Sequence, residues 1–433
     1  LDLLGTEEVD GFYDVIEWAG VQERSTGRIG SMGISWLAML QWLVAARRPP
    51  HLAAIIPWEG STDPYREFGR QGGIFANAFL EFWWRLQITP QQYGYGTRTA
   101  EELAADRVLL FDEMQRREFI DDWYRERTPD LERIEVPVLA AGNWGSLHLH
   151  QRGTIEGFQR VGSEVRQLLV TSGTHIGPFY EPWAKARQQR FLDRFLKDEQ
   201  NGAEHDAPVR LAIRGRNQIE WRDESEWPIA RTEWRKLHLD ASDGSMGWDA
   251  PPHAATTSYS ANDGEQRFTF TATEEVEFTG PMALRLWVSS SGDDVDVMLH
   301  LHVEDRDGNV RLGIAPQGGP IALAMGWLRA SHRALDEDRS LPYRPVHRHT
   351  DADPLVPHTP VALDIEIWPT SITLGQGDTL VVRVRAEDDE LGPMAHNDPT
   401  DRAELRTYTT TLLTGGEYDS ALLVPVIPAQ RLA

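Results

Sequence analysis

The N-terminal part of the chain alternates between two apolar patterns. Val9, Phe12, Tyr13 and Ile16 recur at the spacing i, i+3, i+4, i+7, which predicts a helix over 7–19 with one buried face. Uninterrupted apolar runs are typical of parallel strands buried on both faces, and they occur at 51–60, 136–144 and 165–173. A shorter strand is expected near 28–33, and further helices are expected over 35–46, 148–161 and 181–198. This alternation predicts a doubly wound, mostly parallel α/β sheet.

Residues 61–130 interrupt this alternation. The stretch is aromatic and helix-like, and it includes Phe75, Phe79, Phe82, Trp83 and Trp84. Parallel sheets bind their ligands at the carboxyl ends of the strands, so an insertion there would cover the site. We therefore expect a helical cap.

The pattern changes after residues 201–208. Glycine and proline become frequent, helical periodicity ends, and short alternating runs recur, among them FTFTA, MALRLWVS, DVMLHLHVE and TLVVRVRAE. Turn signals such as RDGN and GQGD are typical of connections between antiparallel strands with one buried face. The sequence thus predicts an α/β domain over 1–205 and a β-sandwich or jelly roll over 206–433.

Composition excludes several classes of protein. A chain of 433 residues exceeds what one hydrophobic core usually supports, which also favours two domains. The net charge of −24 disfavours nucleic acid and anionic membranes as partners. The absence of cysteine excludes disulfides and thiolate chemistry. Without a visible export signal or a membrane-spanning apolar stretch, a cytoplasmic location is the default expectation.

The segment GRIGSMGISW contains the clearest candidate for chemistry. A strand that ends in Gly33, Ile34 and Ser35, with a helix beginning at the serine, matches the nucleophile elbow of serine hydrolases. Gly33 permits a close approach of the chain, and the sharp turn exposes the serine hydroxyl. The backbone N–H of Trp36, at the helix start, is placed to stabilise an oxyanion. The alternative is a serine that caps an ordinary helix.

A nucleophilic serine needs a base, and His175 is the candidate. It lies in TSGTHIGPFY, directly after the strand that ends near residue 170. A histidine downstream of the nucleophile, after the last strand, has the order expected of an α/β-hydrolase. The alternative is a surface histidine with local hydrogen bonds only.

Five stretches, in order along the chain, also resemble a known family. They are YDVIEWAGVQERSTGRIGSMGISWLAMLQWLVAARRPPHLAAIIPWEGSTDPYREF, GNWGSLHLHQRGTIEGF, FLDRFLKDEQNG, FTGPMALRLWVSSSGDDVDVMLHLHVED and GWLRASHRALD. They resemble the cocaine esterase family, whose relatives include α-amino-acid ester hydrolases and X-Pro dipeptidyl peptidases. The resemblance implies an α/β-hydrolase domain with a helical cap, a C-terminal jelly roll, and a Ser-His-Asp triad in which Ser35 and His175 match nucleophile and base.

The acid of that triad does not match. The family's aspartate closes the strand that here ends AGNWG, with Gly145 at its place. A carboxylate is still needed to orient the imidazole, and Glu59, in PWEG, ends the preceding strand at the same edge of the sheet. We predict Glu59 as the acid, with Asp63 as its substitute and Asn143 as a weaker polar orienter. The alternative for Glu59 is a solvated carboxylate or one paired with Arg66.

The resemblance further implies strands and helices before the helix at 7–19. They would form the first half of the sheet and supply a tyrosine to the oxyanion hole. A sheet that begins at its nucleophile strand leaves an apolar edge uncovered. We expect either that this chain is a fragment of a longer or cleaved product, or that a separate N-terminal segment or a second copy of the chain completes the sheet.

The expected function is hydrolysis of a small-molecule acyl ester through an acyl-serine intermediate, with amides as a further candidate substrate class. Aromatic residues are candidates for an apolar pocket, although such residues more often belong to a core, and the candidates are Trp58, Trp83, Trp84 and Trp144. An X-Pro dipeptidyl peptidase is the first alternative, but it would need an acidic anchor for a free amino terminus that is not identifiable. The second is a hydrolase that has lost its acid and serves as a binding or scaffold subunit.

Three H-x-H pairs raise the question of a metal: His148/His150, His300/His302 and His347/His349. His300 and His302 would face the same side of a strand. No third ligand is evident from the spacing, and structural histidines are the more common case. We predict no metal and no cofactor.

Overall fold

The computed structural model describes residues 2–88, 90, 97–105, 110–216, 218–388 and 400–428. The chain forms two compact units, Leu1–Gly69 with Ala76–Leu211 and Arg70–Phe75 with Ala212–Ala433. The hairpin at 70–75 lies within the stretch predicted as a cap, but it groups with the second unit. The physical reason is a backbone hydrogen bond, in which the N–H of Arg329 donates to the carbonyl of Gly72 at 2.8 Å.

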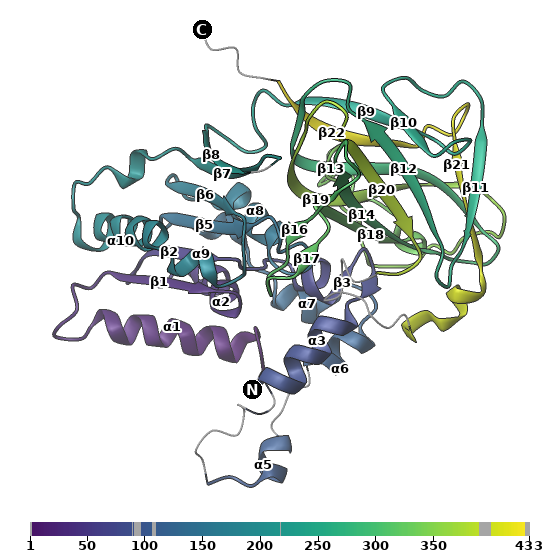
Figure 1. Ribbon diagram of the computed structural model, residues 1–433. Helices are drawn as coiled ribbons and strands as arrows, with labels where there is room; N and C mark the ends of the chain where they lie inside the picture. Colours follow the sequence, from purple (N-terminus) through teal and green to yellow (C-terminus); the bar gives the residue numbers. More distant parts are fainter. Residues whose placement is uncertain are drawn as a thin grey trace. The chain divides into compact units, whose positions relative to one another are not determined.

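The first unit is built on a parallel sheet (Figure 1). The strands of this six-stranded sheet follow the order β1 (Ile29–Ile34), β2 (Leu52–Trp58), β5 (Val138–Asn143), β6 (Arg166–Thr171), β7 (Val209–Arg214) and β8 (Ile219–Glu224). From β1 to β7, neighbouring strands pair in parallel. The predicted mostly parallel α/β sheet is therefore confirmed, and the carboxyl ends of its strands share one edge.

Four helices of this unit form where apolar periodicity predicts them. They are α1 (Thr6–Gly20), α2 (Trp36–Ala46), α8 (Gln151–Arg160) and α10 (Pro182–Lys197). The one-turn helix α9 (Gly177–Tyr180) was not predicted. On α10, Phe191 packs against Ile56 and Leu139 of two neighbouring strands. The helix predicted over 148–161 begins only at Gln151, because residues 147–150 form a turn.

Short elements fill the chain between β2 and β5. They are η1 (Tyr65–Gly69), β3 (Arg70–Gln71), β4 (Ile74–Phe75), α3 (Asn77–Trp83), η2 (Trp84–Ile88), α5 (Ala100–Ala105), α6 (Leu110–Arg116), α7 (Asp122–Glu126) and η3 (Leu131–Arg133). Of these, α3 borders the pocket described below.

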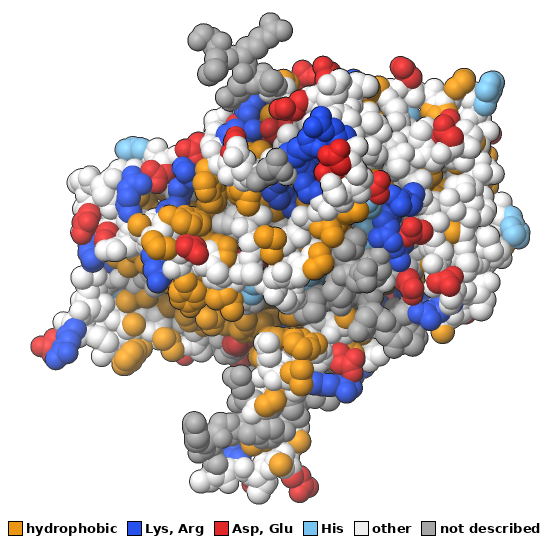
Figure 2. Space-filling model, in the orientation of Figure 1, with side chains coloured by type: hydrophobic (Ala, Val, Ile, Leu, Met, Phe, Trp, Pro, Cys, Tyr) orange, Lys and Arg blue, Asp and Glu red, His pale blue; other side chains and the backbone are white. Residues whose placement is uncertain are grey.

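Strand β1 is the outer strand of the described sheet. Two apolar side chains near this edge, Met32 and Leu37, are 40% and 59% exposed. Figure 2 shows hydrophobic side chains gathered over the first unit on the face it presents. The segment or second copy expected to cover this edge stays a prediction.

The second unit is a β-rich domain that closes on itself. The long strand β13 pairs with both β19 and β22, and β22 pairs in turn with β9. Its core is aliphatic and aromatic, with Phe278, Leu284 and Leu363 fully buried. The predicted C-terminal β-domain is therefore confirmed.

The strands after β7 are β8 (Ile219–Glu224), β9 (Glu233–Asp240), β10 (Ser245–Gly247), β11 (Ala255–Ser260), β12 (Glu265–Thr271), β13 (Val276–Ser290), β14 (Asp296–Glu304), β15 (Val310–Arg311), β16 (Gly313–Ile314), β17 (Pro320–Ile321), β18 (Ala324–Arg329), β19 (Val361–Leu374), β20 (Thr379–Arg385), β21 (Thr409–Thr414) and β22 (Ala421–Ile427). Short 3₁₀ turns are η4 (Ala203–His205), η5 (Ala330–His332) and η6 (Thr400–Thr407). Within the described ranges, no helix has the length and apolar character needed to cross a bilayer.

Candidate active site

Ser35 occupies a strained turn between β1 and α2. Its backbone has φ +62° and ψ −120°, a region that residues other than glycine avoid at a cost of about 1–3 kcal/mol. The Ser35 N–H donates to the carbonyl of Trp58 at 3.0 Å, which ties the turn to β2. A Cβ on Gly33 would lie 2.6 Å from the Cβ of Leu37, so only glycine lets α2 start this close to the strand. The sequence thus enforces the turn that exposes the hydroxyl.

Trp36 supplies the candidate oxyanion donor. It is the first residue of α2, and the first N–H groups of a helix have no intrahelical acceptor. The helix dipole adds partial positive charge at the same place. The indole Nε1 of Trp36 donates to Oε1 of Glu8 at 3.0 Å, which connects the residue after the serine to α1.

Glu59 and His175 form a hydrogen-bonded pair in which Glu59 is buried and His175 is partly exposed. Nδ1 of His175 donates to Oε2 of Glu59 at 2.8 Å, and Glu59 is fully buried. Glu59 also has a positive φ of +50°, a second strained residue at the same edge of the sheet. It is neither solvated nor paired with Arg66, which instead donates to Asp63 at 2.6 Å. The structure therefore joins the predicted acid and base.

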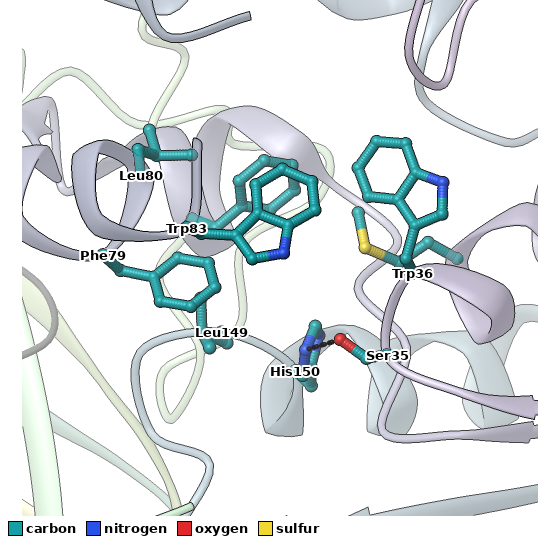
Figure 3. Close-up of a pocket in the computed structure, with 9 residues that line it drawn as sticks. Ser35, Trp36, Phe79, Leu80, Trp83, Leu149 and His150 are labelled. Atoms are coloured by element: carbon teal, nitrogen blue, oxygen red, sulfur yellow. Dashed lines mark hydrogen bonds between the residues drawn. The ribbon is translucent and has the colours of Figure 1, made fainter. Parts of the chain in front are cut away.

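A second histidine, which the sequence reasoning did not assign to catalysis, contacts the serine. Oγ of Ser35 lies 3.1 Å from Nε2 of His150, as Figure 3 shows. The His150 ring stacks on the His175 ring, with centroids 5.3 Å apart and an interplanar angle of 15°. His150 was weighed only as half of an H-x-H metal pair. Its place just after β5, at the edge that holds Ser35, was the signal that could have found it.

The surroundings keep His150 uncharged. Burial lowers the pKa of His150 well below its ordinary range, and the neighbouring rings of His175 and His148 lower it further. A neutral imidazole offers one donor and one acceptor nitrogen. Within the described residues Nδ1 of His150 has no hydrogen-bond partner, so Nε2 makes the ring's contact with Ser35.

The first turn of α8 is fastened to the segment that follows Glu59; we call these contacts the α8 clamp. Gly60 N–H donates to Oγ1 of Thr154 at 3.2 Å, and Oγ1 of Thr62 donates to the carbonyl of Gly153 at 3.4 Å. Arg152 donates to the carboxylate of Glu67 at 3.2 Å. The α8 clamp holds the helix that follows His150 against the chain that follows Glu59.

Glu67 is the centre of the clamp. Its Oε2 accepts the hydroxyl of Ser61 and the N–H groups of Thr62 and Asp63. Burial raises the pKa of Glu67 to about 7, although the charge of Arg152 opposes this. A Cβ on Gly153 would lie 2.2 Å from Oε2 of Glu67, so α8 approaches this closely only because residue 153 is glycine.

A small apolar pocket opens above the serine (Figure 3). Its volume is about 20 Å³, enough for a single water molecule. The rings of Trp36 and Trp83 pack beside it with centroids 5.2 Å apart. Its lining consists of Ser35, Trp36, Met39, Phe68, Phe79, Leu80, Trp83, Leu149 and His150.

Of the four tryptophans predicted to bind substrate, Trp83 alone lines this pocket. Trp58 is fully buried and packs edge-on against Phe179 at 5.3 Å. Trp84 and Trp144 are buried outside the lining. Trp58 and Trp144, at or just after strand ends, are fully buried, so their side chains lie away from this pocket.

Asp63 and Asn143, the alternatives to Glu59 as the acid, contact groups other than the imidazole of His175. Asp63 pairs with Arg66. Asn143 donates through Nδ2 to the carbonyl of Gly173 at 2.7 Å and accepts the N–H of Gly145 at 3.0 Å. Asn143 therefore holds the loop that leads to His175, and its hydrogen bonds within the described residues go to the backbone of Gly173, Thr174 and Gly145.

In the second unit, His300 and His302 contact carboxylates of the protein, and Nδ1 of His349 lies 3.0 Å from Nδ1 of His332. Nε2 of His300 lies 2.8 Å from Oδ1 of Asp388, and Nε2 of His302 lies 3.5 Å from Oε1 of Glu304. Across the described ranges, no group of three or more His, Asp or Glu side chains is arranged to hold a metal ion.

A strained serine at the edge of a parallel sheet, with imidazole groups and a buried carboxylate beside it, defines a serine hydrolase of the α/β class. Comparison with known proteins agrees. Residues 1–177 match the X-Pro dipeptidyl-peptidase (S15) family, and residues 201–423 match the X-Pro dipeptidyl-peptidase C-terminal non-catalytic domain.

A CocE/NonD family hydrolase from Staphylococcus aureus is 30% identical, with a TM-score of 0.89 over 99% of this chain and 77% of that one. Cocaine esterase from Rhodococcus sp. is 23% identical over 416 residues, 74% of this chain and 68% of its own length. An aminopeptidase from a marine sediment archaeon shares the fold at 16% identity, with a TM-score of 0.73 over 96% and 79% of the two chains. The chain belongs to the CocE/NonD family of hydrolases.

Proposed function

We propose that this protein cleaves carboxylic acyl esters through an acyl-serine intermediate formed on Ser35. The observation on which this rests most directly is the backbone of Ser35, whose φ of +62° exposes Oγ at a helix start. Such strain persists only where surrounding structure imposes it. Here it brings a hydroxyl within 3.1 Å of an imidazole.

In this reaction Oγ of Ser35 attacks the ester carbonyl carbon while His175 takes the hydroxyl proton. The carbonyl oxygen becomes an oxyanion facing the N–H of Trp36. Collapse of the tetrahedral intermediate breaks the bond to the alcohol, which leaves with the proton from His175. Water then attacks the acyl-serine by the same route, and the carboxylic acid is released.

The assignment of His175 as base is supported by its partner. A carboxylate at Nδ1 fixes the tautomer so that Nε2 is free to accept a proton, and it stabilises the imidazolium that forms. Glu59 makes this contact at 2.8 Å from a fully buried position. Since His175 stacks directly on the ring that contacts Ser35, the Glu59–His175 pair lies beside the nucleophile.

An ester is favoured over a peptide by the pocket. Its lining is apolar apart from Ser35 and His150, and an X-Pro peptidase needs a group that binds a protonated amino terminus. No carboxylate belongs to the described lining. The proposed substrates are therefore esters with a short, apolar acyl group.

A fluorophosphonate probe tests the proposal directly. The wild-type protein should be labelled, Ser35→Ala should not, and Ser31→Ala, on the same strand β1, should be labelled like wild type. Short p-nitrophenyl esters should be hydrolysed in the same pattern. Labelling that persists in Ser35→Ala would refute the assignment. A folded protein that reacts with neither probe nor ester would instead support a binding or scaffold role, and cleavage of X-Pro p-nitroanilides in preference to esters would support the peptidase.

A further inference from the structure

We infer that His150 is a positioning group that holds the Ser35 hydroxyl through its Nε2, while the Glu59–His175 pair acts as the base. This inference deepens the proposed function and rests on it. The site would then use two imidazoles for two tasks: His150 holds the serine hydroxyl and His175 takes its proton. A catalytic triad needs only one imidazole.

The contacts divide the two tasks. His150 has the hydrogen bond to Oγ of Ser35, at 3.1 Å. His175 has the hydrogen bond to a carboxylate, at 2.8 Å. A base that receives the serine proton becomes a cation, and a cation in a buried site needs a counter-charge. Of the two imidazoles, His175 has a carboxylate at Nδ1, whereas Nδ1 of His150 has no hydrogen-bond partner within the described residues.

His150 is unsuited to be the base on electrostatic grounds as well. Only 4% of its surface is exposed, and Nδ1 has no hydrogen-bond partner within the described residues. Burial and the neighbouring His175 and His148 lower its pKa well below its ordinary range. A general base works best with a pKa near the operating pH. A neutral ring that stays neutral is suited to holding a hydroxyl in place.

The α8 clamp fixes this ring relative to the acid. His150 directly precedes α8, and the helix is joined to the segment after Glu59 through the Thr154–Gly60 and Arg152–Glu67 contacts. The stacked rings of His150 and His175 complete the connection. Contacts within one connected set thus join the residue that holds the serine to the residue that orients the base, and positioning requires such a fixed arrangement.

Replacement of His150 separates the roles. His150→Gln keeps a polar atom near the place of Nε2 that can donate or accept, whereas His150→Leu keeps volume and removes the hydrogen bond. We expect His150→Leu to lose about tenfold in kcat, the value of one hydrogen bond, with little change in KM. His150→Gln should recover most of that loss. His175→Gln should lose several further orders of magnitude, since it removes the base.

The pH dependence of labelling is a second test of this role, because a residue that only supports the fold would not alter it. Protonation of His150 at acid pH would place a charge beside His148 and His175 and disturb the hydrogen bond to Oγ. Protonation of the base lowers fluorophosphonate labelling in wild type and in His150→Gln alike, so the labelling rate of the wild type should fall more steeply at the acid end of the profile than that of His150→Gln.

The outcomes decide between roles. If His150→Gln is as inactive as His175→Gln, His150 is the base and the inference is wrong. If folded His150→Leu, checked by circular dichroism, keeps full kcat and an unchanged pH profile, His150 has no role in the reaction and the inference is again wrong. Failure of the proposed function itself would look different, because wild type would then not be labelled at Ser35 at all.

Discussion

Replacement of Glu59 by glutamine tests the electrostatic core of the site. The change keeps the size of the side chain and its hydrogen-bonding capacity but removes one negative charge from a fully buried position 2.8 Å from Nδ1 of His175. The imidazolium that forms in the transition state then lacks its counter-charge. The neutral ring is affected much less, so the loss should fall on the chemical step.

The magnitude follows from Coulomb's law. Charges centred about 4 Å apart attract by about 4 kcal/mol at an effective dielectric constant of about 20. At about 1.36 kcal/mol per decade, this is about a 10³-fold loss of kcat. The corresponding change in a serine protease lowers kcat by about 10⁴, because the amide also favours the wrong tautomer.

The assay is steady-state hydrolysis of a p-nitrophenyl ester, with kcat and KM determined separately. Asp63→Asn is the matched control, since it neutralises a nearby buried carboxylate that pairs with Arg66 and not with the imidazole. We expect it to retain most activity. Unchanged turnover in Glu59→Gln, or an equal loss in both variants, would refute the reasoning.

Three further predictions concern the clamp and the pocket. Because burial raises the pKa of Glu67 to about 7 from 4.5, its contribution to stability is present below about pH 4.5 and lost as the pH rises through about 7; chemical denaturation should show this slope flattened in Glu67→Gln. Gly153→Ala should cost about 1–3 kcal/mol of stability, read as a lower Tm, because its Cβ meets Glu67 at 2.2 Å; an unchanged Tm would contradict the close approach. Trp83→Ala should raise kcat/KM for bulky acyl esters relative to acetate by about tenfold, and an unchanged ratio would place the acyl group elsewhere.

The layers of the fold can be predicted from the sequence because a buried face places apolar residues at a regular spacing along the chain. Strand β2 is apolar throughout because both its faces are covered, and α1 repeats its buried positions Val9 and Ile16 at helical spacing. Glu59 and His175 both follow strands at the carboxyl edge of the sheet, which is the basis for predicting them as acid and base, and in the structure they lie 2.8 Å apart.

The sequence could not show which way a side chain points, into the core or into the pocket. Trp58 and Trp83 look alike as apolar residues near a strand end or a cap, but one packs into the core against Phe179 and the other lines the pocket. His150 was overlooked because one imidazole satisfies the chemistry of a triad, so nothing called for a second. The hairpin at 70–75 was assigned to the cap because two-residue strands leave too short a pattern to show where they pair.

The packing of Trp36 on Trp83 gives this site its own optical reporter. One indole belongs to the residue beside the nucleophile and the other to α3, and their centroids lie 5.2 Å apart, close enough for the two chromophores to interact. Both indoles line the small space above Ser35, so an acyl group that enters it lies against them. Near-ultraviolet circular dichroism, read as the difference between wild type and Trp83→Phe, would therefore follow the admission of a ligand without any attached dye.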